Sequence, residues 1–227
     1  MKRLYIITAF LLLLFPSVPA LAQEREDALM IWSTTTISKS LGNEKKWTLG
    51  LLSEYRHQIH EGVSKTNQYF LRPSVAYKVL PYLSLKYQMD FAATSSGFQM
   101  RFIPEINFTH KEGDFAFSFR QRAQTTWKVE AGTNSTVLRT RAKAEYSIPK
   151  TPMGVHFAIE PYWCDFSKTS FAWFQRIRWY AGFSIKLTDH LTLIPEYECQ
   201  AYHNHKGKYD RRTYDDHVIY FTFAVKL

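Results

Sequence analysis

The sequence contains little glycine or proline, and beyond residue 22 it contains no long hydrophobic run. With 9 Gly and 9 Pro in 227 residues, collagen-like and low-complexity chains are excluded. No window after Gln23 approaches the ~18 uninterrupted apolar residues of a transmembrane helix, so a helical inner-membrane protein is excluded. Acidic residues are also scarce, because 20 Asp and Glu stand against 29 Lys and Arg, a formal net charge of +9. At this length one domain is expected.

Recognisable catalytic motifs are missing as well. The sequence has no G-x-S-x-G, H-E-x-x-H, Walker or dinucleotide-binding pattern. It therefore predicts no catalytic residue, no cofactor-binding residue and no metal ligand. The two cysteines, Cys164 and Cys199, lack zinc-type spacing. Aromatic residues, by contrast, make up 16% of the chain, which argues against disorder.

What is present begins with an export signal. Two basic residues at positions 2–3 precede an apolar run over residues 4–15, and Ala-Leu-Ala at residues 20–22 forms a small-x-small cleavage pattern. The apolar run is shorter than the ~20 residues of a membrane-spanning helix. These features predict a cleaved signal peptide over residues 1–22 and a single domain over residues 23–227.

Along the mature chain, apolar and polar residues alternate with a period of two. In residues 83–91 every second side chain is apolar, and the side chains between them are Ser, Lys, Gln and Asp. Residues 115–128, 171–187 and 219–227 repeat the alternation. A period of two over eight or more residues predicts a β-strand with one apolar and one polar face. The two cysteines fall on opposite faces of non-adjacent strands, so we expect free thiols.

Strand length favours a membrane barrel. Most of the candidate strands are 10 to 14 residues long, whereas soluble strands have ~5–6 residues and a tilted membrane strand needs ~9–11. The sequence therefore predicts an all-β fold, an antiparallel transmembrane up-and-down β-barrel. The candidate strands cover residues 29–39, 47–57, 66–79, 82–92, 98–110, 115–128, 135–147, 154–164, 171–187, 191–202 and 214–227.

The connections between these segments alternate in length. Tight links at 80–81, 111–114, 148–153 and 188–190 alternate with longer, more polar loops. Outer-membrane barrels have short periplasmic turns and longer outer loops, and in bacteria an even number of strands. Eleven segments do not fit that rule. We therefore expect about 10–12 strands, with ten if residues 29–39 are not a full strand and twelve if a long segment is split.

The polar face carries most of the charge of the predicted strands, with 15 basic and 8 acidic residues. A lipid-facing Arg or Lys near the bilayer centre costs ~2–4 kcal/mol, so these charges require the water and ion-pair partners of a polar lumen. Three Arg-x-Arg pairs would either attract anions or pair with carboxylates that fill a narrow interior, and we favour the second hypothesis. The predicted lumen charge network consists of Arg101, Glu105, Arg120, Arg122, Arg139, Arg141, Glu145, Glu160, Arg176, Arg178, Glu196 and Glu198.

Tryptophans on the apolar face indicate two membrane interfaces. Trp127, Trp163 and Trp173 fall near the outer-loop ends of their strands, and Trp47 falls at the opposite end of its own. Aromatic belts at both interfaces have this pattern, although a soluble sandwich would hold the same residues in its core. Proline lacks the N–H that a strand ladder uses, so bulges or local edges are expected at four prolines on this face, at positions 73, 104, 161 and 195.

Two other classes of protein remain open. In a soluble periplasmic β-barrel the apolar face would line a cavity for a hydrophobic ligand, and alternation alone does not distinguish that arrangement from a membrane barrel. An outer-membrane lipid-modifying enzyme needs a Ser–His pair. The strand histidines are His110 and His156, and the sequence places no serine beside either, Ser118 on a neighbouring strand being the candidate.

The last predicted loop contains a small group of histidines. His203 and His205 share a face and could ligate a metal. The ordinary polarity of a loop explains them equally well, so no metal site is predicted there.

Several segments also resemble a known family. They are Trp32, KKWTLGLLSEYR at 45–56, NQYFLRPSVAYKVLPYLSLKYQ at 67–88, FSFRQR at 117–122, VLRTRAKAEY at 137–146, IEPYW at 159–163, RIRWYAGFSIKLTDHLTLIPEYE at 176–198 and the closing HVIYFTFAVKL. With these features the chain resembles the outer-membrane β-barrel family catalogued as domain of unknown function 2490, found in Gram-negative bacteria. The resemblance implies the bacterial outer membrane and the barrel fold. Since the activity of that family is unknown, it implies no site residue.

Together these patterns predict an outer-membrane β-barrel that is either structural or a narrow, porin-like channel with a charged, net basic lumen. The sequence does not predict an enzyme. Expected partners are outer-membrane lipids and the barrel-assembly machinery, which would receive the C-terminal strand. The signal peptide and the membrane alternation exclude nucleic acid as a partner, despite the basic charge.

Overall fold

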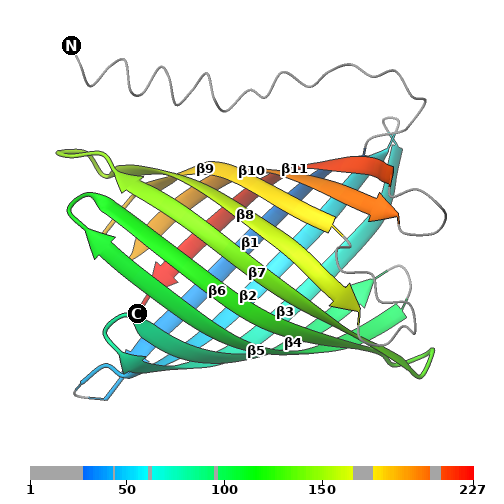
Figure 1. Ribbon diagram of the computed structural model, residues 1–227, viewed down its shortest axis with the longest axis horizontal. Helices are drawn as coiled ribbons and strands as arrows, with labels where there is room; N and C mark the ends of the chain where they lie inside the picture. Colours follow the sequence, from blue (N-terminus) through cyan, green and yellow to red (C-terminus); the bar gives the residue numbers. More distant parts are fainter. Residues whose placement is uncertain (1–27, 43, 61–62, 95–96, 166–175, 205–210) are drawn as a thin grey trace, which may run out of the picture.

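The fold is entirely β in the part of the chain that the computed structural model describes, residues 28–42, 44–60, 63–94, 97–165, 176–204 and 211–227. The predicted signal peptide lies outside these residues. No described helix has the length and apolarity to cross a membrane. The strands are β1 Ala28–Leu41, β2 Trp47–His60, β3 Val63–Leu80, β4 Leu83–Thr94, β5 Gly97–Glu112, β6 Phe115–Lys128, β7 Thr133–Ser147, β8 Met153–Asp165, β9 Arg176–Lys186, β10 Leu191–Asn204 and β11 Arg211–Lys226 (Figure 1).

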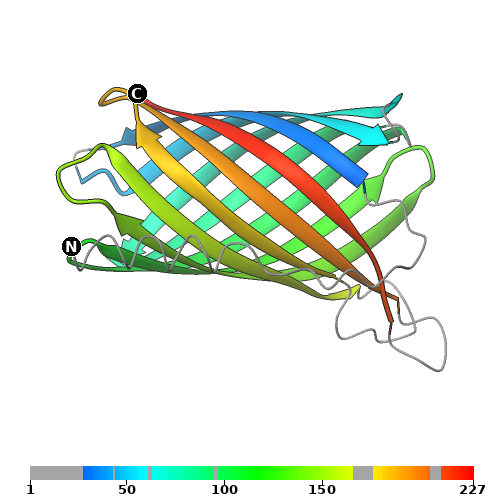
Figure 2. The same cartoon turned by 90° about the horizontal axis from the view of Figure 1, so that it is seen from above.

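The eleven strands close into one barrel, each beside its neighbour in sequence. Consecutive strands pair antiparallel, whereas β1 and β11 pair in parallel, from Ala28↔Asp216 to Ser38↔Lys226. Figure 2 shows these two strands side by side. The predicted barrel of about 10–12 strands is therefore confirmed, at eleven strands, whereas the even-number rule that favoured ten or twelve does not hold for the described chain. β1 is a full strand of 14 residues, no long segment is split, and the parallel pair closes an odd number.

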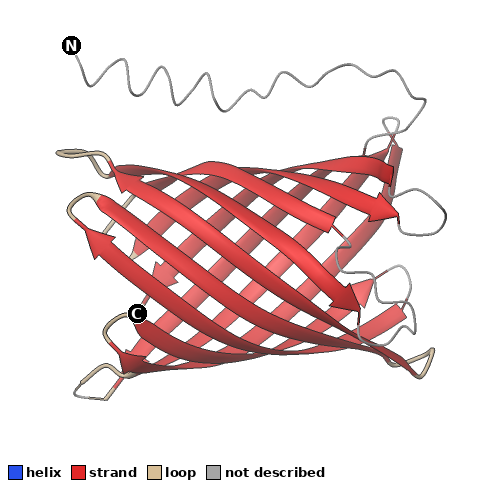
Figure 3. Ribbon diagram, viewed as in Figure 1, coloured by secondary structure: helices blue, strands red, loops and turns tan. Residues whose placement is uncertain are grey.

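The expected alternation of short and longer links holds only in part. The links at 42–46, 81–82, 113–114, 148–152 and 187–190 lie at the end that holds the C-terminus (Figure 3), but the links at 61–62, 95–96 and 129–132, at the end where β1 begins, are equally short. The link at 113–114 joins Glu112 to its register partner Phe115 through two residues. Gly113 in that link has a φ of 58°, a left-handed conformation that two-residue hairpin turns require and that glycine adopts without strain.

The outer and inner surfaces of the barrel differ in polarity. Phe117 and Leu49 point outward and are 50% and 48% exposed, whereas Glu160 and Asp90 point inward and are 0% exposed. Because side chains alternate across a strand, the apolar face of each strand contributes to the outer surface and the polar face to the interior. A soluble barrel that binds a hydrophobic ligand needs the reverse arrangement, which the described residues contradict.

The four prolines within strands interrupt pairing on one side. Beside Pro73, the β3–β4 ladder passes from Leu71↔Phe91 to Ser74↔Gln88 without a shift. Similar gaps occur beside the other three prolines, Pro104, Pro161 and Pro195. The sequence predicted bulges or local edges at these positions. The structure has local losses of pairing at all four. One register shift, in the β7–β8 ladder between Tyr162 and Asp165, lies beside Pro161, and the others lie away from these prolines.

The parallel closure of the barrel predicts a specific disulfide. In a chain with Cys164→Ser and Cys199→Ser, Ile37→Cys combined with Val225→Cys should form an intramolecular bond, because these residues are register partners on strands ~4.8 Å apart. The control combines Ile37→Cys with Phe221→Cys, which the strand rise separates by ~13 Å. Mass spectrometry of non-reduced digests measures both yields. Equal yields would contradict the parallel register.

Candidate functional site

Alternating positions on the strands bring the charged side chains together around a lumen cavity of about 430 Å³. Nine arginines and Lys86 line it, facing four glutamates. Asp90 and Glu105 contact the same cations. Ten cations therefore face six carboxylates, which leaves the side chains around the cavity with an excess of four positive charges.

Two pairs of arginines face each other directly across β6 and β7. Arg120 is the register partner of Arg141, and Arg122 is the register partner of Arg139. Like charges directly opposite one another destabilise a sheet. These strands therefore depend on carboxylates supplied by other strands.

Glu160 on β8 supplies the carboxylate that the arginine pairs share. Arg120 donates from Nη2 to its Oε1 at 2.7 Å, and Arg139 donates from Nη2 to its Oε2 at 2.9 Å. The hydroxyl of Tyr180 on β9 also donates to Oε2, at 2.7 Å. Charge-assisted hydrogen bonds of this kind are stronger than neutral ones. One carboxylate thus connects β6, β7, β8 and β9 inside the barrel.

Two further carboxylates engage the other members of the arginine pairs. Arg122 donates to Oε2 of Glu105 from Nε at 2.8 Å and from Nη2 at 2.5 Å. Arg141 lies 3.4 Å from Oε2 of Glu196 on β10, and the same oxygen lies 2.7 Å from Nε2 of His156. Outside this group, Asp90 pairs with Arg72 and Arg101, Glu54 with Arg56, and Glu198 with Arg178.

Aromatic rings hold several of these guanidinium groups in place. Cζ of Arg56 lies 3.8 Å from the ring centroid of Trp32. Three guanidinium groups surround Tyr162, with Cζ of Arg176 at 3.9 Å, Arg139 at 4.4 Å and Arg178 at 5.0 Å. Cation–π contacts of this length are attractive. They restrict rotation of the guanidinium groups.

The structure places the predicted charge network as follows. Ten of its twelve residues line the cavity, and Glu105 contacts cations that do so. Glu145 lies apart, near the short link after β7, and pairs with Lys143 at 2.9 Å. Trp32, Tyr162 and Tyr180 also line the cavity, although the sequence predicted no place for them in the lumen. Tyr162 and Tyr180 share the strand parity of Glu160 and Arg178, which is the signal that could have identified them.

Three of the four predicted interface tryptophans project from the outer surface. Trp47, Trp127 and Trp163 are 49%, 46% and 40% exposed. Trp47 begins β2 at the end that holds the C-terminus, and Trp127 lies beside the link at 129–132 at the other end. Trp173 lies outside the described residues.

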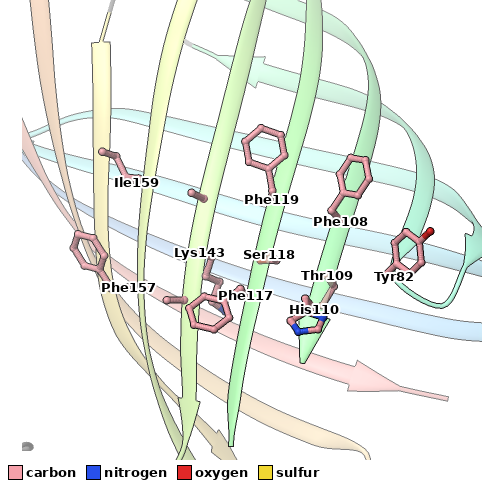
Figure 4. A pocket seen from close by; sticks show the side chains of 12 residues that line it. Tyr82, Phe108, Thr109, His110, Phe117, Ser118, Phe119, Lys143, Phe157 and Ile159 are labelled. Atoms are coloured by element: carbon pink, nitrogen blue, oxygen red, sulfur yellow. The ribbon is translucent and has the colours of Figure 1, made fainter. Parts of the chain in front are cut away.

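An apolar groove of about 510 Å³ lies on the outer surface of the barrel. Ala142 and Ala144 on β7 form its floor between larger side chains of β6 and β8, including Phe117 and Phe157 (Figure 4). His110 lies at this groove, and its register partner is Phe117.

The predicted Ser–His candidates do not form a catalytic pair. Ser118 follows Phe117 on β6, so its side chain alternates to the opposite face of the sheet from His110. His156 bonds to Glu196. No cluster of metal ligands occurs among the described residues, and the side chains of His203 and His205 lie outside them.

Comparisons with known proteins agree with this architecture. A family model described as "Protein of unknown function (DUF2490)" matches residues 29–211. No curated protein matches the sequence. Among solved structures, the chain is similar to one described as a NanC porin in a rhombohedral crystal form, with a TM-score of 0.55 and 14% identity. The similarity covers 88% of this chain and 99% of that one, and at this identity it concerns the fold alone.

The shared carboxylate predicts a large effect of one substitution. Glu160→Gln should destabilise the barrel by ~3 kcal/mol, because it removes the nearest counter-charge of Arg120 and Arg139, which face other arginines, and leaves Arg120 only the longer contact with Glu105 at 3.8 Å. The matched control Glu145→Gln removes a half-exposed partner of a single lysine, and its cost should stay under ~1 kcal/mol. Urea unfolding in lipid vesicles, followed by tryptophan fluorescence, measures both. Equal losses would contradict the role of Glu160.

Proposed function

The chain belongs to the DUF2490 family of proteins of unknown function, and we propose that it is an outer-membrane β-barrel whose lumen is a narrow channel for small anions. In this proposal residues 1–22 are a cleaved signal peptide. Lipids surround the barrel, and the barrel-assembly machinery receives β11. The observation that carries the channel function is the excess of positive charge around the lumen cavity.

The outer surface supports a membrane location. Large apolar side chains are exposed on every side of the barrel, among them Leu71 at 47% and Ile219 at 40%. Monomeric soluble proteins rarely expose contiguous apolar patches of more than a few hundred Å². The described strands, of 11 to 18 residues, exceed the ~9–11 that a tilted strand needs to span the hydrocarbon core.

The lumen charges support transport of anions. The six carboxylates at the lumen cavity are each paired with arginine or histidine, as Glu160 is with Arg120 and Arg139. By contrast, Lys86 lines the cavity and has no ion pair or hydrogen bond among the described residues. A cleft lined by charge of one sign raises the local concentration of the opposite ion. The size of the cavity restricts passage to small solutes.

The membrane location predicts the behaviour of the expressed chain. In a Gram-negative host, the full-length protein should sediment with the outer membrane, require detergent for extraction and migrate faster on a gel before boiling than after it. A closed barrel that stays folded in detergent until it is boiled produces this shift in mobility. Recovery in the soluble periplasmic fraction, without a shift, would contradict the proposal.

The channel function predicts a change in ion selectivity. Purified protein in planar bilayers should give small conductance steps. In a KCl gradient the reversal potential should shift toward the equilibrium potential of chloride. Lys86→Gln should reduce the chloride-to-potassium permeability ratio by about fivefold, as expected for loss of a ~1 kcal/mol attraction.

Lys150→Gln is the matched control, because Lys150 lies in an exposed link outside the cavity. It should leave the permeability ratio unchanged. Absence of conductance steps in the unmodified protein would contradict the channel function and favour a purely structural barrel.

A further inference from the structure

Several buried hydrogen-bond donors in the lumen have no acceptor among the described residues. Five of them are Nε atoms of Arg72, Arg101, Arg120, Arg139 and Arg141, and two belong to aromatic side chains, the indole Nε1 of Trp32 on β1 and the hydroxyl of Tyr162 on β8. Trp32 is 4% exposed and Tyr162 is 1% exposed, and both side chains line the cavity. A buried donor without an acceptor costs ~1–3 kcal/mol, so such groups in native proteins call for an explanation.

The rings that carry the two aromatic donors lie near the same guanidinium group. Cζ of Arg178 is 5.0 Å from the ring centroid of Tyr162 and 5.5 Å from that of Trp32. Other guanidinium groups cover the ring faces, with Arg56 over Trp32 and Arg176 over Tyr162. The indole N–H and the phenolic O–H lie at the edges of these rings. They are therefore the groups that a solute beside Arg178 would meet.

The polar groups around this point are mainly donors. Guanidinium and indole groups only donate hydrogen bonds, and the nearby carboxylates already have partners, since Glu198 pairs with Arg178 at 3.1 Å and Glu54 pairs with Arg56. A solute that fits must supply acceptors and negative charge. Carboxylate and phosphate groups do both and match guanidinium geometry. The cavity, at about 430 Å³, lies in the lower part of the ~300–1,000 Å³ range of small-molecule sites.

We propose that Trp32, Tyr162 and Arg178 form an oxyanion-binding site in the lumen, which takes small organic solutes that carry a carboxylate or phosphate group. In this site the indole and the hydroxyl each donate to an oxygen of the anion, and the cations that outnumber the carboxylates around the cavity, Arg178 among them, supply the positive potential. The site rests on the proposed channel function, because the solute reaches it through the lumen, and it adds the chemical class of the solute.

Calorimetric titration of the full mature chain in detergent micelles tests the site. The probes are D-glucuronate, D-glucose as its neutral counterpart, and inorganic phosphate. Glucuronate should bind saturably and glucose should not. Phosphate that competes with glucuronate would assign the shared oxyanion chemistry to the site. Saturable binding of phosphate alone would narrow the solute class to phosphate-bearing solutes. Equal binding of glucose and glucuronate, or no saturable binding of either anion, would overturn the proposal.

Two conservative variants test the unpartnered donors. Trp32→Phe and Tyr162→Phe each remove one donor and keep an aromatic ring beside the guanidinium groups. Each should weaken binding by about tenfold, the usual effect of losing one hydrogen bond to a charged group. Neither donor has a partner within the described chain, so both variants should fold with unchanged heat-modifiability.

Trp179→Phe and Tyr87→Phe are matched controls, because both side chains project from the outer surface and are 42% exposed. They should bind as the unmodified protein does. If Trp32→Phe and Tyr162→Phe bind with unchanged affinity, the proposed site is refuted, and the channel function still stands if the protein conducts and selects anions. If binding is saturable and weakened in these variants but the protein gives no conductance, the site stands and the channel function is refuted.

Discussion

The arginines that face one another inside the barrel must be neutralised, and the carboxylate of Glu160 meets much of that requirement. β6 and β7 place Arg120 opposite Arg141 and Arg122 opposite Arg139. In a narrow interior these charges cannot all retain full hydration. Glu160 reaches two of them and also accepts a hydrogen bond from Tyr180. The alignment of four neighbouring strands therefore depends on one buried side chain.

The same constraint sets the width of the lumen. Carboxylates that neutralise the arginines occupy space, as do the rings that hold the guanidinium groups, and the remaining cavity is about 430 Å³. The Arg-x-Arg pairs were expected either to pair with carboxylates or to attract anions, and the two hypotheses apply to different parts of one interior. Arg120, Arg122 and Arg139 serve ion pairs, while the excess of cations around the cavity supports the proposed attraction of anions.

Much of the fold could be predicted from sequence because strand structure is encoded locally. Alternation located all eleven strands, and the predicted range 115–128 coincides with β6 as the structure has it. The same parity placed Arg101, Arg178 and their charged neighbours on one face. Parity also puts Tyr162 and Tyr180 on that face, but the sequence did not identify them or Trp32 as lumen residues. An aromatic ring in the lumen has the same apolar character as one on the outer surface, so hydropathy alone does not distinguish the two positions.

By itself, the sequence determined the strands, their two faces and the basic excess, since each follows from side chains two residues apart along the chain. The tertiary structure decided how the barrel closes and which charges meet. The parallel pairing of β1 with β11 joins residues at the two ends of the chain, and no local period encodes it. The contact of Arg141 with Glu196, 55 residues away, exists because closure and strand stagger bring β7 and β10 across the lumen. Periodicity selects the face on which a side chain lies, and only closure selects its partner.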